Sequence, residues 1–445
     1  MKANKEKNVQ EALTYLEKEL KGKVDDFVLS ASVGKKTQIK FANDSIATTQ
    51  SWELQNLEIF VNLKQRLVST NVQDLRDAAL SQTVTRLISF AQKSEPNKEY
   101  QGIAQGSFKY SFKPSIDPKI KQLENPFLSV RDALAAARAH GAERSAGVFE
   151  FSHSAYHLLS SGGSAGDGED SSVYFSIRSH KGSGSGYSNQ VGRSLAELDP
   201  ERAGASAAQT AVRAQHAEPI DAGVYDVLFS EYPFAYIATH FATSASISEV
   251  ETQTSCLAGQ LGKQVASPGI TLYDDPTLPQ GLASRPFDDE GVPSQKTCIV
   301  KNGILQTYLH NTSTAKRYGT TTTANAGLVS PDNTNLVVEG LTVPEHKLVE
   351  DFTGLHITNL WYMRFQNYIV GDFSTIPRDG IFLYKKGECV KAVKDIRVTD
   401  NMLRLFKNIR AQSEKRVQQC GWEVDDPVVC GKVVVDGVTI TKSVK

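Results

Sequence analysis

The sequence predicts an α+β fold, in which an N-terminal α/β domain with small sheets and flanking helices precedes a β-rich, mostly antiparallel C-terminal domain. Apolar residues recur at helical spacing near both ends of the first 95 residues, with alternating strand-like runs between them. From about Gly223 onward, short β-rich runs are broken by Gly, Pro, Asn and Asp. With 445 residues, 40% hydrophobic and 22% charged, the chain is long enough for two or three structural units.

The first predicted unit is the N-terminal α/β domain, residues 1–95. Its first helix covers residues 8 to 20, because Val9, Leu13, Leu16 and Leu20 form one apolar stripe. Strands are expected in the runs DFVLSAS, TQIKFAND and LEIFVNLKQRLVSTNV. In the last run, Lys64-Gln65 is expected to form a tight turn between two strands. A second helix is predicted in DLRDAALSQTVTRLISFAQ.

The second predicted unit is a central segment, residues 96–218, with helices and a long β-ribbon. It begins with a linker-like stretch from Pro96 to Pro118, and a helix follows with Asn125 as its N-cap and Gly141 as its stop. The ribbon is predicted in GVFEFSHSAYHLLSSGG and SSVYFSIRSHKGSGSGYSN, separated by the polar stretch SSGGSAGDGED. We interpret KGSGSGYSN as a flexible hairpin end. An Ala-rich helix within Leu195–Ala217 closes the segment.

The third predicted unit is the β-rich C-terminal domain, residues 219–445. Its strand-like runs are short: ITLYDD, TCIVKNGILQTYLH, GLHITNLWYM, GIFLYKKGECVKAV and KVVVDGVTITK. In VKNGIL and VVDGVT, an Asn-Gly or Asp-Gly pair lies between apolar residues, which is the pattern of a two-residue hairpin. We therefore expect a mostly antiparallel sheet with a hairpin at each of these places.

Charge and cysteine content exclude several classes of function. Lys and Arg number 49 and Asp and Glu 50, so the net charge of -1 gives no general attraction to nucleic acid or to an anionic membrane. The charged N-terminus has no apolar signal region, and no stretch reaches the roughly 18 apolar residues of a membrane span. The five cysteines never occur as CxxC, which disfavours a disulfide framework or a zinc ribbon. We expect a soluble, cytoplasmic protein.

His153 and His157 have the HxxxH spacing with which a helix can present two zinc ligands on one face. The alternation around them favours a strand, where they would stand roughly 13 Å apart at about 3.3 Å per residue. That separation is too large for one shared ion. The chain also lacks a phosphate-loop pattern and a GxSxG nucleophile elbow, so neither a nucleotide-binding protein nor a hydrolase triad is predicted.

Two further stretches carry candidate chemistry. FAYIATHFATS is predicted as a core helix with a single histidine, His240. The segment Asp288-Asp289-Glu290, the acidic loop, places three acids beside glycine and proline, and such acids can ligate a hard cation or orient water. They equally suit pairing with Arg285 and Lys296, or capping of the following strand.

The block SCLAGQLGKQVASPGITLYDDPTLPQGLASRPFDDEGVPSQKTCIVKNGILQTYLHNTSTAKRYG strongly resembles the TldD/PmbA family, the so-called modulators of DNA gyrase. The N-terminal FVLSAS, KTQIKFAND and NLEIFVNLKQRLVSTN, and VVCGKVVVDGVTIT near the end, extend the resemblance over most of the chain. The resemblance implies a two-component system. TldD-type chains carry a helical HExxxH whose histidines bind zinc together with a Cys of the closing motif, whereas PmbA-type chains, also called TldE, lack the motif and partner the active subunit.

Carried onto this sequence, the HExxxH positions fall at Ala238, Thr239 and Thr243, none of which is a metal ligand or a base. Between residues 232 and 248 there is no Asp or Glu and only one His. The zinc mechanism needs two imidazoles on the metal and a carboxylate that activates its water. The sequence therefore predicts no catalytic residue and no metal site in this chain.

We expect a non-catalytic, PmbA/TldE-like subunit of a zinc-dependent peptide-processing metalloprotease, dimeric with a TldD-like subunit that carries the zinc and acts on unfolded peptides. Cys430 would then hold a vestigial ligand position and His240 would line the core or a cavity. The acidic loop would shape the cavity wall or the interface. Two alternatives stay open: an atypical metallopeptidase that uses His240, Cys430 and the acidic loop, and a homodimeric peptide-binding protein without protease activity.

Overall fold

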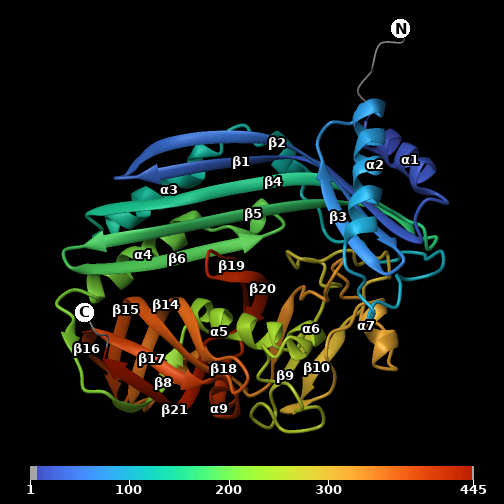
Figure 1. Ribbon diagram of the computed structural model, residues 1–445. Helices are drawn as coiled ribbons and strands as arrows, with labels where there is room; N and C mark the ends of the chain where they lie inside the picture. Colours follow the sequence, from blue (N-terminus) through green and yellow to red (C-terminus); the bar gives the residue numbers. More distant parts are fainter. Residues whose placement is uncertain (1–7, 443–445) are drawn as a thin grey trace.

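The structure is a computed structural model that describes residues 8–442, and it confirms the α+β class. A six-stranded antiparallel sheet with four long helices forms one half of the molecule, and a β-rich half lies beneath it (Figure 1). In the described part of the chain, none of the helices combines the length and the apolar character that crossing a lipid bilayer requires.

The first half contains every element up to residue 213. These are α1 (Val9–Leu20), β1 (Asp26–Ala42), β2 (Ser45–Leu63), β3 (Arg66–Val72), α2 (Asp77–Lys93), the short 3-10 helix η1 (Pro118–Gln122), α3 (Phe127–Ala139), β4 (Arg144–Ser160), β5 (Ala165–Lys181), β6 (Gly184–Gly192), η2 (Leu195–Glu197) and α4 (Pro200–Arg213). The stretch from Pro96 to Pro118 contains no strand and no helix before η1, as expected of a linker.

All strands of this half belong to one sheet, in the order β3-β2-β1-β4-β5-β6. The runs DFVLSAS and TQIKFAND belong to the single strand β1, which ends at Ala42 and pairs with β4 of the central segment from Val28 to Ala42. The turn at Lys64-Gln65 is confirmed, since both residues have positive φ, 51° and 62°. Helix α3 begins one residue later than predicted, because Pro126 rather than Asn125 is its N-cap.

The glycine-rich stretch KGSGSGYSN does contain the end of the β5–β6 hairpin, at Gly182-Ser183, but most of it is ordered as β6. A Cβ atom on Gly184 or Gly186 would come within 2.1 Å of a carbonyl oxygen of α4, on Ala211 or Ala207 respectively. The glycines are therefore explained by the close approach of a helix to the strand. The polar stretch SSGGSAGDGED is also mainly strand, since β5 begins at Ala165.

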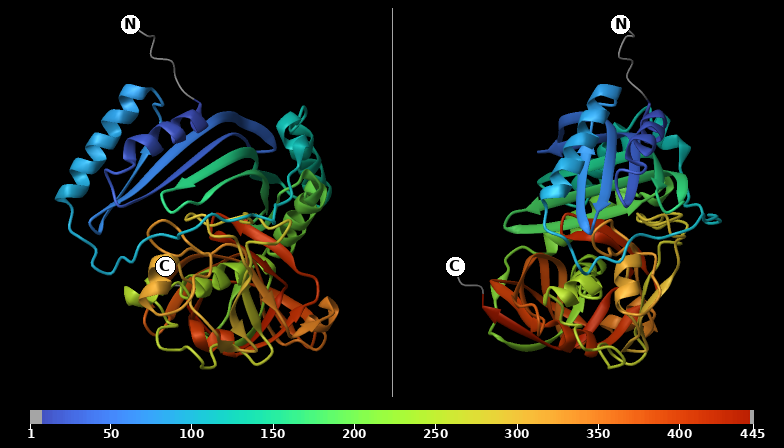
Figure 2. Two further views of the ribbon diagram at one scale, coloured as in Figure 1. Left: turned by 90° about the vertical axis from the view of Figure 1, so that its right-hand side faces the viewer. Right: turned by 45° about the vertical axis from the view of Figure 1, so that its right-hand side comes forward.

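Each face of this sheet has a distinct character. Most odd-numbered residues of β1 are apolar and are buried under helices, with Phe27 and Leu29 in the core below α1 and α2 and Phe41 in the core below α3 and α4. Figure 2 shows the two helix pairs at opposite ends of the sheet. Even-numbered residues such as Gln38 and Lys40 point to the other face, which is turned toward the C-terminal half.

The contact between α3 and α4 depends on Gly204. A Cβ atom at this position would lie 2.0 Å from the carbonyl oxygen of Ala133. An alanine at position 204 would therefore force the two helices apart. We expect Gly204→Ala to lower the free energy of unfolding by about 1–3 kcal/mol, measured by urea denaturation. Gly223→Ala is the matched control, since its Cβ would have no neighbour closer than 3.6 Å. Equal effects of the two substitutions would contradict this account.

The second half contains the remaining elements. These are β7 (Glu218–Pro219), β8 (Gly223–Phe229), α5 (Glu231–Thr243), α6 (Ile247–Glu251), β9 (Thr271–Asp274), β10 (Thr297–Lys301), β11 (Ile304–Leu305), α7 (Thr312–Arg317), β12 (Leu336–Glu339), β13 (Thr342–Val343), α8 (Glu345–Val349), β14 (Gly354–Asn367), β15 (Asp372–Lys385), β16 (Glu388–Lys394), β17 (Ile396–Asn401), α9 (Met402–Lys407), β18 (Ile409–Ser413), β19 (Val417–Gly421), β20 (Val424–Cys430) and β21 (Val433–Lys442).

These strands form two mixed sheets that enclose α5. One sheet has six strands, β11-β10-β9-β12-β20-β19, and the other has nine, in which β17 pairs with both β15 and β21 and so closes a circuit of strands. The hairpin predicted in VKNGIL is confirmed, with positive φ at Asn302 and Gly303. The hairpin predicted in VVDGVT is wrong. Strand β21 continues through Asp436-Gly437 as a bulge, because its residues on both sides of the pair bond to β8.

Candidate functional site

Helix α5 contains the predicted FAYIATHFATS and lies at the centre of the second half. Ten of its thirteen residues are buried, which explains why the segment is apolar on nearly every side. Ser230 precedes the helix as its N-cap, and the helix packs against β20 and β14. The three HExxxH positions and His240 therefore lie on an element that the fold holds firmly.

The three HExxxH positions hold side chains that cannot bind zinc as imidazoles do. Ala238 is fully buried. The Thr239 hydroxyl donates to an Asp426 carboxyl oxygen at 3.4 Å, and the Thr243 hydroxyl donates to the carbonyl of Thr239 at 3.0 Å. Asn333 donates to the same Asp426 oxygen at 3.3 Å. Burial raises the pKa of Asp426 to about 6, against the opposing hydrogen bond from Asn333. A hydroxyl–amide–carboxyl cluster thus stands where the family motif has its metal ligands.

His240 points into an aromatic environment. Its ring centroid lies 5.1 Å from that of Tyr236 and 5.6 Å from that of Phe365. Burial lowers the pKa of His240 to about 4, with Asp425 opposing the shift, so the imidazole is neutral at pH 7. Its Nε2 atom is buried and has no hydrogen-bond partner within residues 8–442.

Cys430 is sealed inside the core at the end of β20. Its side chain is fully buried, and its Sγ donates to the carbonyl oxygen of Glu231 at 3.5 Å. Burial raises the pKa of the thiol well above its ordinary value, whereas zinc binds the thiolate. In the described part of the chain, no three His, Cys, Asp or Glu side chains are grouped as a metal site would require. The residues around α5 therefore do not fit a zinc ion.

The acidic loop is mostly buried structure. Asp288 accepts hydrogen bonds from the backbone N–H groups of Glu290 and Val292 at 3.0 and 2.9 Å, and burial raises its pKa to about 6. Glu290 accepts from the backbone N–H of Ala104 in the linker. Only Asp289 is substantially exposed, and it pairs with Arg285 at 2.8 Å, as predicted.

Two other pairings concern residues singled out in the sequence. Lys296 pairs with Asp275 at 3.7 Å, outside the acidic loop, and this part of the prediction is wrong. His153 and His157 both lie on β4, as the alternation indicated. His153 Nε2 contacts a Glu169 carboxylate oxygen at 3.2 Å across to β5.

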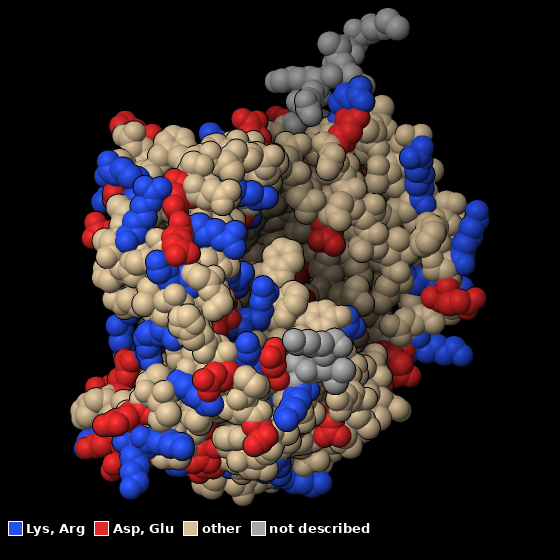
Figure 3. All heavy atoms as spheres, turned by 90° about the vertical axis from the view of Figure 1, so that its left-hand side faces the viewer, with Lys and Arg blue, Asp and Glu red and all other residues tan. Residues whose placement is uncertain are grey.

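A cleft of about 940 Å³ separates the polar face of the six-stranded sheet from the C-terminal half. The space-filling view shows the molecule hollowed between its two halves on one side (Figure 3). Its lining includes charges of both signs and several aromatic rings: Lys40, Glu150, Asp170, Tyr174, Arg178, Tyr187, Tyr232, Trp361, Arg378, Trp422, Glu423 and Asp425.

Two tryptophans of the cleft are open to solvent. Trp422, at the tip of the β19–β20 hairpin, is 87% exposed, and Trp361 on β14 has the Arg378 guanidinium 4.3 Å from its ring centroid. Sequence reasoning missed this cleft because its residues come from strands more than 200 positions apart. The only available signal was the alternation of polar residues along β1, β4 and β5.

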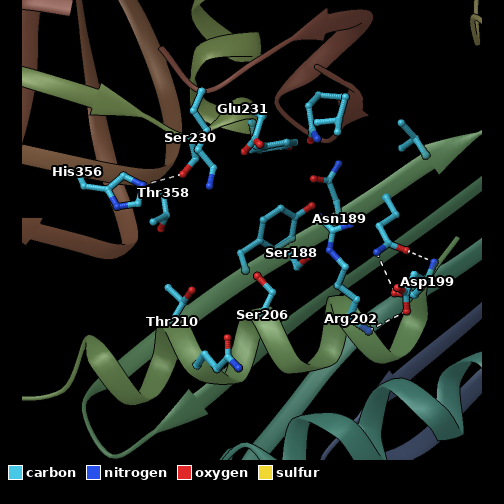
Figure 4. Close-up of a pocket in the computed structure, with 18 of the residues that line it drawn as sticks. Ser188, Asn189, Asp199, Arg202, Ser206, Thr210, Ser230, Glu231, His356 and Thr358 are labelled. Atoms are coloured by element: carbon cyan, nitrogen blue, oxygen red, sulfur yellow. Dashed lines mark hydrogen bonds between the residues drawn. The ribbon is translucent and has the colours of Figure 1, made fainter. Parts of the chain in front are cut away.

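A second pocket, of about 780 Å³, lies between α4, β6 and the start of α5. Figure 4 shows Arg202, Ser206 and Thr210 of α4 facing Ser230 and His356 across it. Ser230 Oγ and His356 Nε2 are 2.9 Å apart, which resembles a nucleophile and its base. Burial, followed by the charges of Lys432 and Arg213, lowers the pKa of His356 to about 3. An imidazole this weakly basic is a poor general base at neutral pH, so we assign the pair a structural role.

Known proteins resemble this chain in both halves. Residues 222–442 match the PmbA/TldA metallopeptidase C-terminal domain. Metalloprotease PmbA of Escherichia coli O157:H7 is 29% identical over 50% of this chain and 48% of that protein, and a PmbA homolog of Haemophilus influenzae is 31% identical over 51% and 50%. The chain thus aligns with about half the length of these relatives.

The fold has a solved counterpart. The crystal structure of TldE from Thermococcus kodakarensis covers 97% of this chain and 100% of its own, with a TM-score of 0.85 and 20% identity. This match shows that both halves have the fold of TldE. The family model and the PmbA relatives, which match the C-terminal half and about half of the chain respectively, identify the chain as a member of the PmbA/TldD family.

Proposed function

We propose that this chain is a non-catalytic, PmbA/TldE-like subunit of a zinc-dependent peptide-processing metalloprotease. The observation that carries the proposal is the occupancy of the HExxxH positions by Ala238, Thr239 and Thr243, of which the two threonines are held in hydrogen bonds. Imidazole ligands and a carboxylate base are both missing there, and Cys430 is buried as a thiol. The zinc and its activated water would come from a TldD-like partner.

The cleft supports a role in holding a peptide. An unfolded segment presents backbone donors and acceptors along its length, and the polar sheet face offers both kinds of group. Trp361 and Trp422 offer exposed aromatic surface for apolar side chains. The name metalloprotease, carried by the relatives, agrees with a place in a protease complex.

Metal content and cleavage test the proposal directly. We expect the purified chain to hold less than about a tenth of an equivalent of zinc. A true zinc site would keep its metal through dialysis, because such sites bind zinc very tightly. It should cleave no unfolded peptide alone. Adding a TldD-like chain that bears HExxxH should yield cleavage that a chelator abolishes, measured by mass spectrometry of the peptide.

Two variants distinguish a non-catalytic subunit from an atypical metallopeptidase. His240→Ala and Cys430→Ala remove the two candidate ligands of this chain, and neither should change metal content. Near one equivalent of zinc that either substitution abolishes, with chelator-sensitive cleavage by the chain alone, would overturn the proposal.

A further inference from the structure

The pocket between α4, β6 and the start of α5, here called the α5 pocket, has no part in the proposed function. Its volume of about 780 Å³ is in the range of pockets that hold small molecules. Hydroxyl and amide groups line it from three elements, and Figure 4 shows Ser188 and Asn189 of β6, Ser206 and Thr210 of α4, and Thr358 of β14 among them. We therefore examine which groups at this pocket lack a partner.

Helix α5 begins at the α5 pocket without a side-chain cap. Ser230 holds the N-cap position, but its hydroxyl makes no hydrogen bond to the first turn of the helix. The hydroxyl is bonded to His356 instead, with 2.9 Å between Oγ and Nε2 (Figure 4). The backbone N–H groups that a serine N-cap ordinarily satisfies are thus left to another acceptor.

Two neighbouring N–H groups remain unpaired at this helix end. The N–H of Phe234 donates to the carbonyl of Ser230 at 3.2 Å, and Pro233 has no N–H to satisfy. The N–H groups of Glu231 and Tyr232 have no acceptor among residues 8–442, and both residues line the pocket. A pair of N–H groups at the positive end of a helix suits the two oxygens of a carboxylate.

Two acceptors lie at the same end of the pocket. Gln419 of β19 is only 7% exposed, yet its Oε1 atom is buried and has no hydrogen-bond partner within residues 8–442. Such an amide destabilises a fold unless a partner reaches it from outside the chain. The Glu231 carboxylate is also free of ion pairs in the described part of the chain, since Lys432, which lines the pocket too, pairs with Glu345. These two oxygens suit a positively charged donor.

We propose that the α5 pocket binds a free α-amino acid. Its carboxylate accepts from the N–H groups of Glu231 and Tyr232, and its ammonium donates to the Glu231 carboxylate and to Gln419 Oε1. A simple anion would be repelled by the Glu231 carboxylate, and a simple cation would leave both N–H groups unpaired. An α-amino acid carries both charged groups on one carbon, which matches donors and acceptors that meet at one residue. The hydroxyl and amide lining favours a polar, uncharged side chain.

This inference goes beyond the proposed function and does not depend on it. Every group that it uses belongs to this chain, and none of them is a candidate zinc ligand. A chain that binds an amino acid here can do so with or without a protease partner, so metal analysis and amino-acid binding test separate properties of the molecule.

Calorimetric titration of the purified full chain with each of the twenty amino acids tests the proposal. At least one with a polar, uncharged side chain should bind with a Kd below about 1 mM. Its N-acetyl derivative lacks the ammonium and its carboxamide lacks the carboxylate, so each should bind about tenfold more weakly or worse. Failure of all twenty would overturn the proposal. So would equal binding of the N-acetyl form or of the carboxamide, because the pocket would then suit a peptide C-terminus or N-terminus.

Substitutions locate the site. Glu231→Gln and Gln419→Met should each weaken binding about tenfold or more. Glu388→Gln and Gln82→Met remove the same groups at exposed positions outside the pocket and should leave the affinity unchanged. Ser230→Asp places a carboxylate at the N-cap, where it competes for the Tyr232 N–H, so binding should fall while the ligand-free melting temperature is kept. Wild-type affinity in all three pocket variants would refute the assignment.

Discussion

Replacing Arg193 with Met is expected to lower the free energy of unfolding by about 3–5 kcal/mol, because a partly buried carboxylate and three carbonyl oxygens all lose the guanidinium as their partner. Arg193 follows β6 and is only 1% exposed. Its guanidinium pairs with Asp170 at 2.6 Å and donates to the carbonyls of Ser115 at 2.8 Å and of Gly281 and Leu282 at 3.1 Å. One side chain therefore joins the sheet, the linker and the C-terminal half, and it does so beside the cleft.

Matched variants separate the charge from the packing. Arg193→Lys keeps the charge but cannot reach four acceptors in one plane, so an intermediate loss is expected. Arg202→Met removes an exposed arginine of α4 and should be nearly neutral. Adding Asp170→Asn to Arg193→Met should recover part of the loss, because the partly buried carboxylate that lost its partner is then replaced by a neutral amide. Urea denaturation of the four proteins measures this, and equal losses for Arg193→Met and Arg202→Met would contradict the role assigned to Arg193.

Local patterns in the sequence predicted the elements well where one short stretch decides the outcome. The apolar stripe of α1, the Lys64-Gln65 turn and the core helix with His240 are examples. The prediction in VVDGVT failed because an Asp-Gly pair suits a bulge as well as a hairpin, and only the pairing of β21 with β8 decides between them. The glycines of β6 were misread because their cause, the approach of α4, lies outside the strand.

The residues of the candidate site also differ in how far the sequence predicts them. The absence of ligands at Ala238, Thr239 and Thr243 is visible in the sequence, since it needs only a motif and its register. Arg193 and the Ser230–His356 pair were not predicted, because each joins residues from separate elements that no local spacing connects. The ion pair between Lys296 and Asp275 could not be predicted either, because the two residues are distant in the sequence and only the folding of the chain brings them together.

The acidic loop gives the second large effect, a loss of stability as the pH rises. Glu290 is 2% exposed, and its burial, followed by the neighbouring charge of Asp288, raises its pKa to about 8 from 4.5. A carboxyl with a raised folded pKa holds its proton in the folded state after the unfolded chain has released it. The stabilisation is therefore complete below about pH 4.5 and is lost as the pH rises toward 8. Since one pKa unit corresponds to about 1.4 kcal/mol, the loss amounts to several kcal/mol.

Glu290→Gln should remove this dependence, because the amide keeps the shape and never ionises. We expect it to be more stable than the wild type at pH 8 and similar at pH 5, in urea denaturation at several pH values. The protection of the Ala104 amide, which donates to Glu290 at 3.2 Å, against hydrogen exchange should fall with rising pH in the wild type only, once the intrinsic pH dependence of the exchange rate is divided out. Asp289→Asn is the control, since Asp289 is half-exposed and paired with Arg285, and it should keep the wild-type pH profile. A wild type whose stability rises between pH 5 and 8 would refute the raised pKa, because the ionised Glu290 would then be the favoured form in the fold.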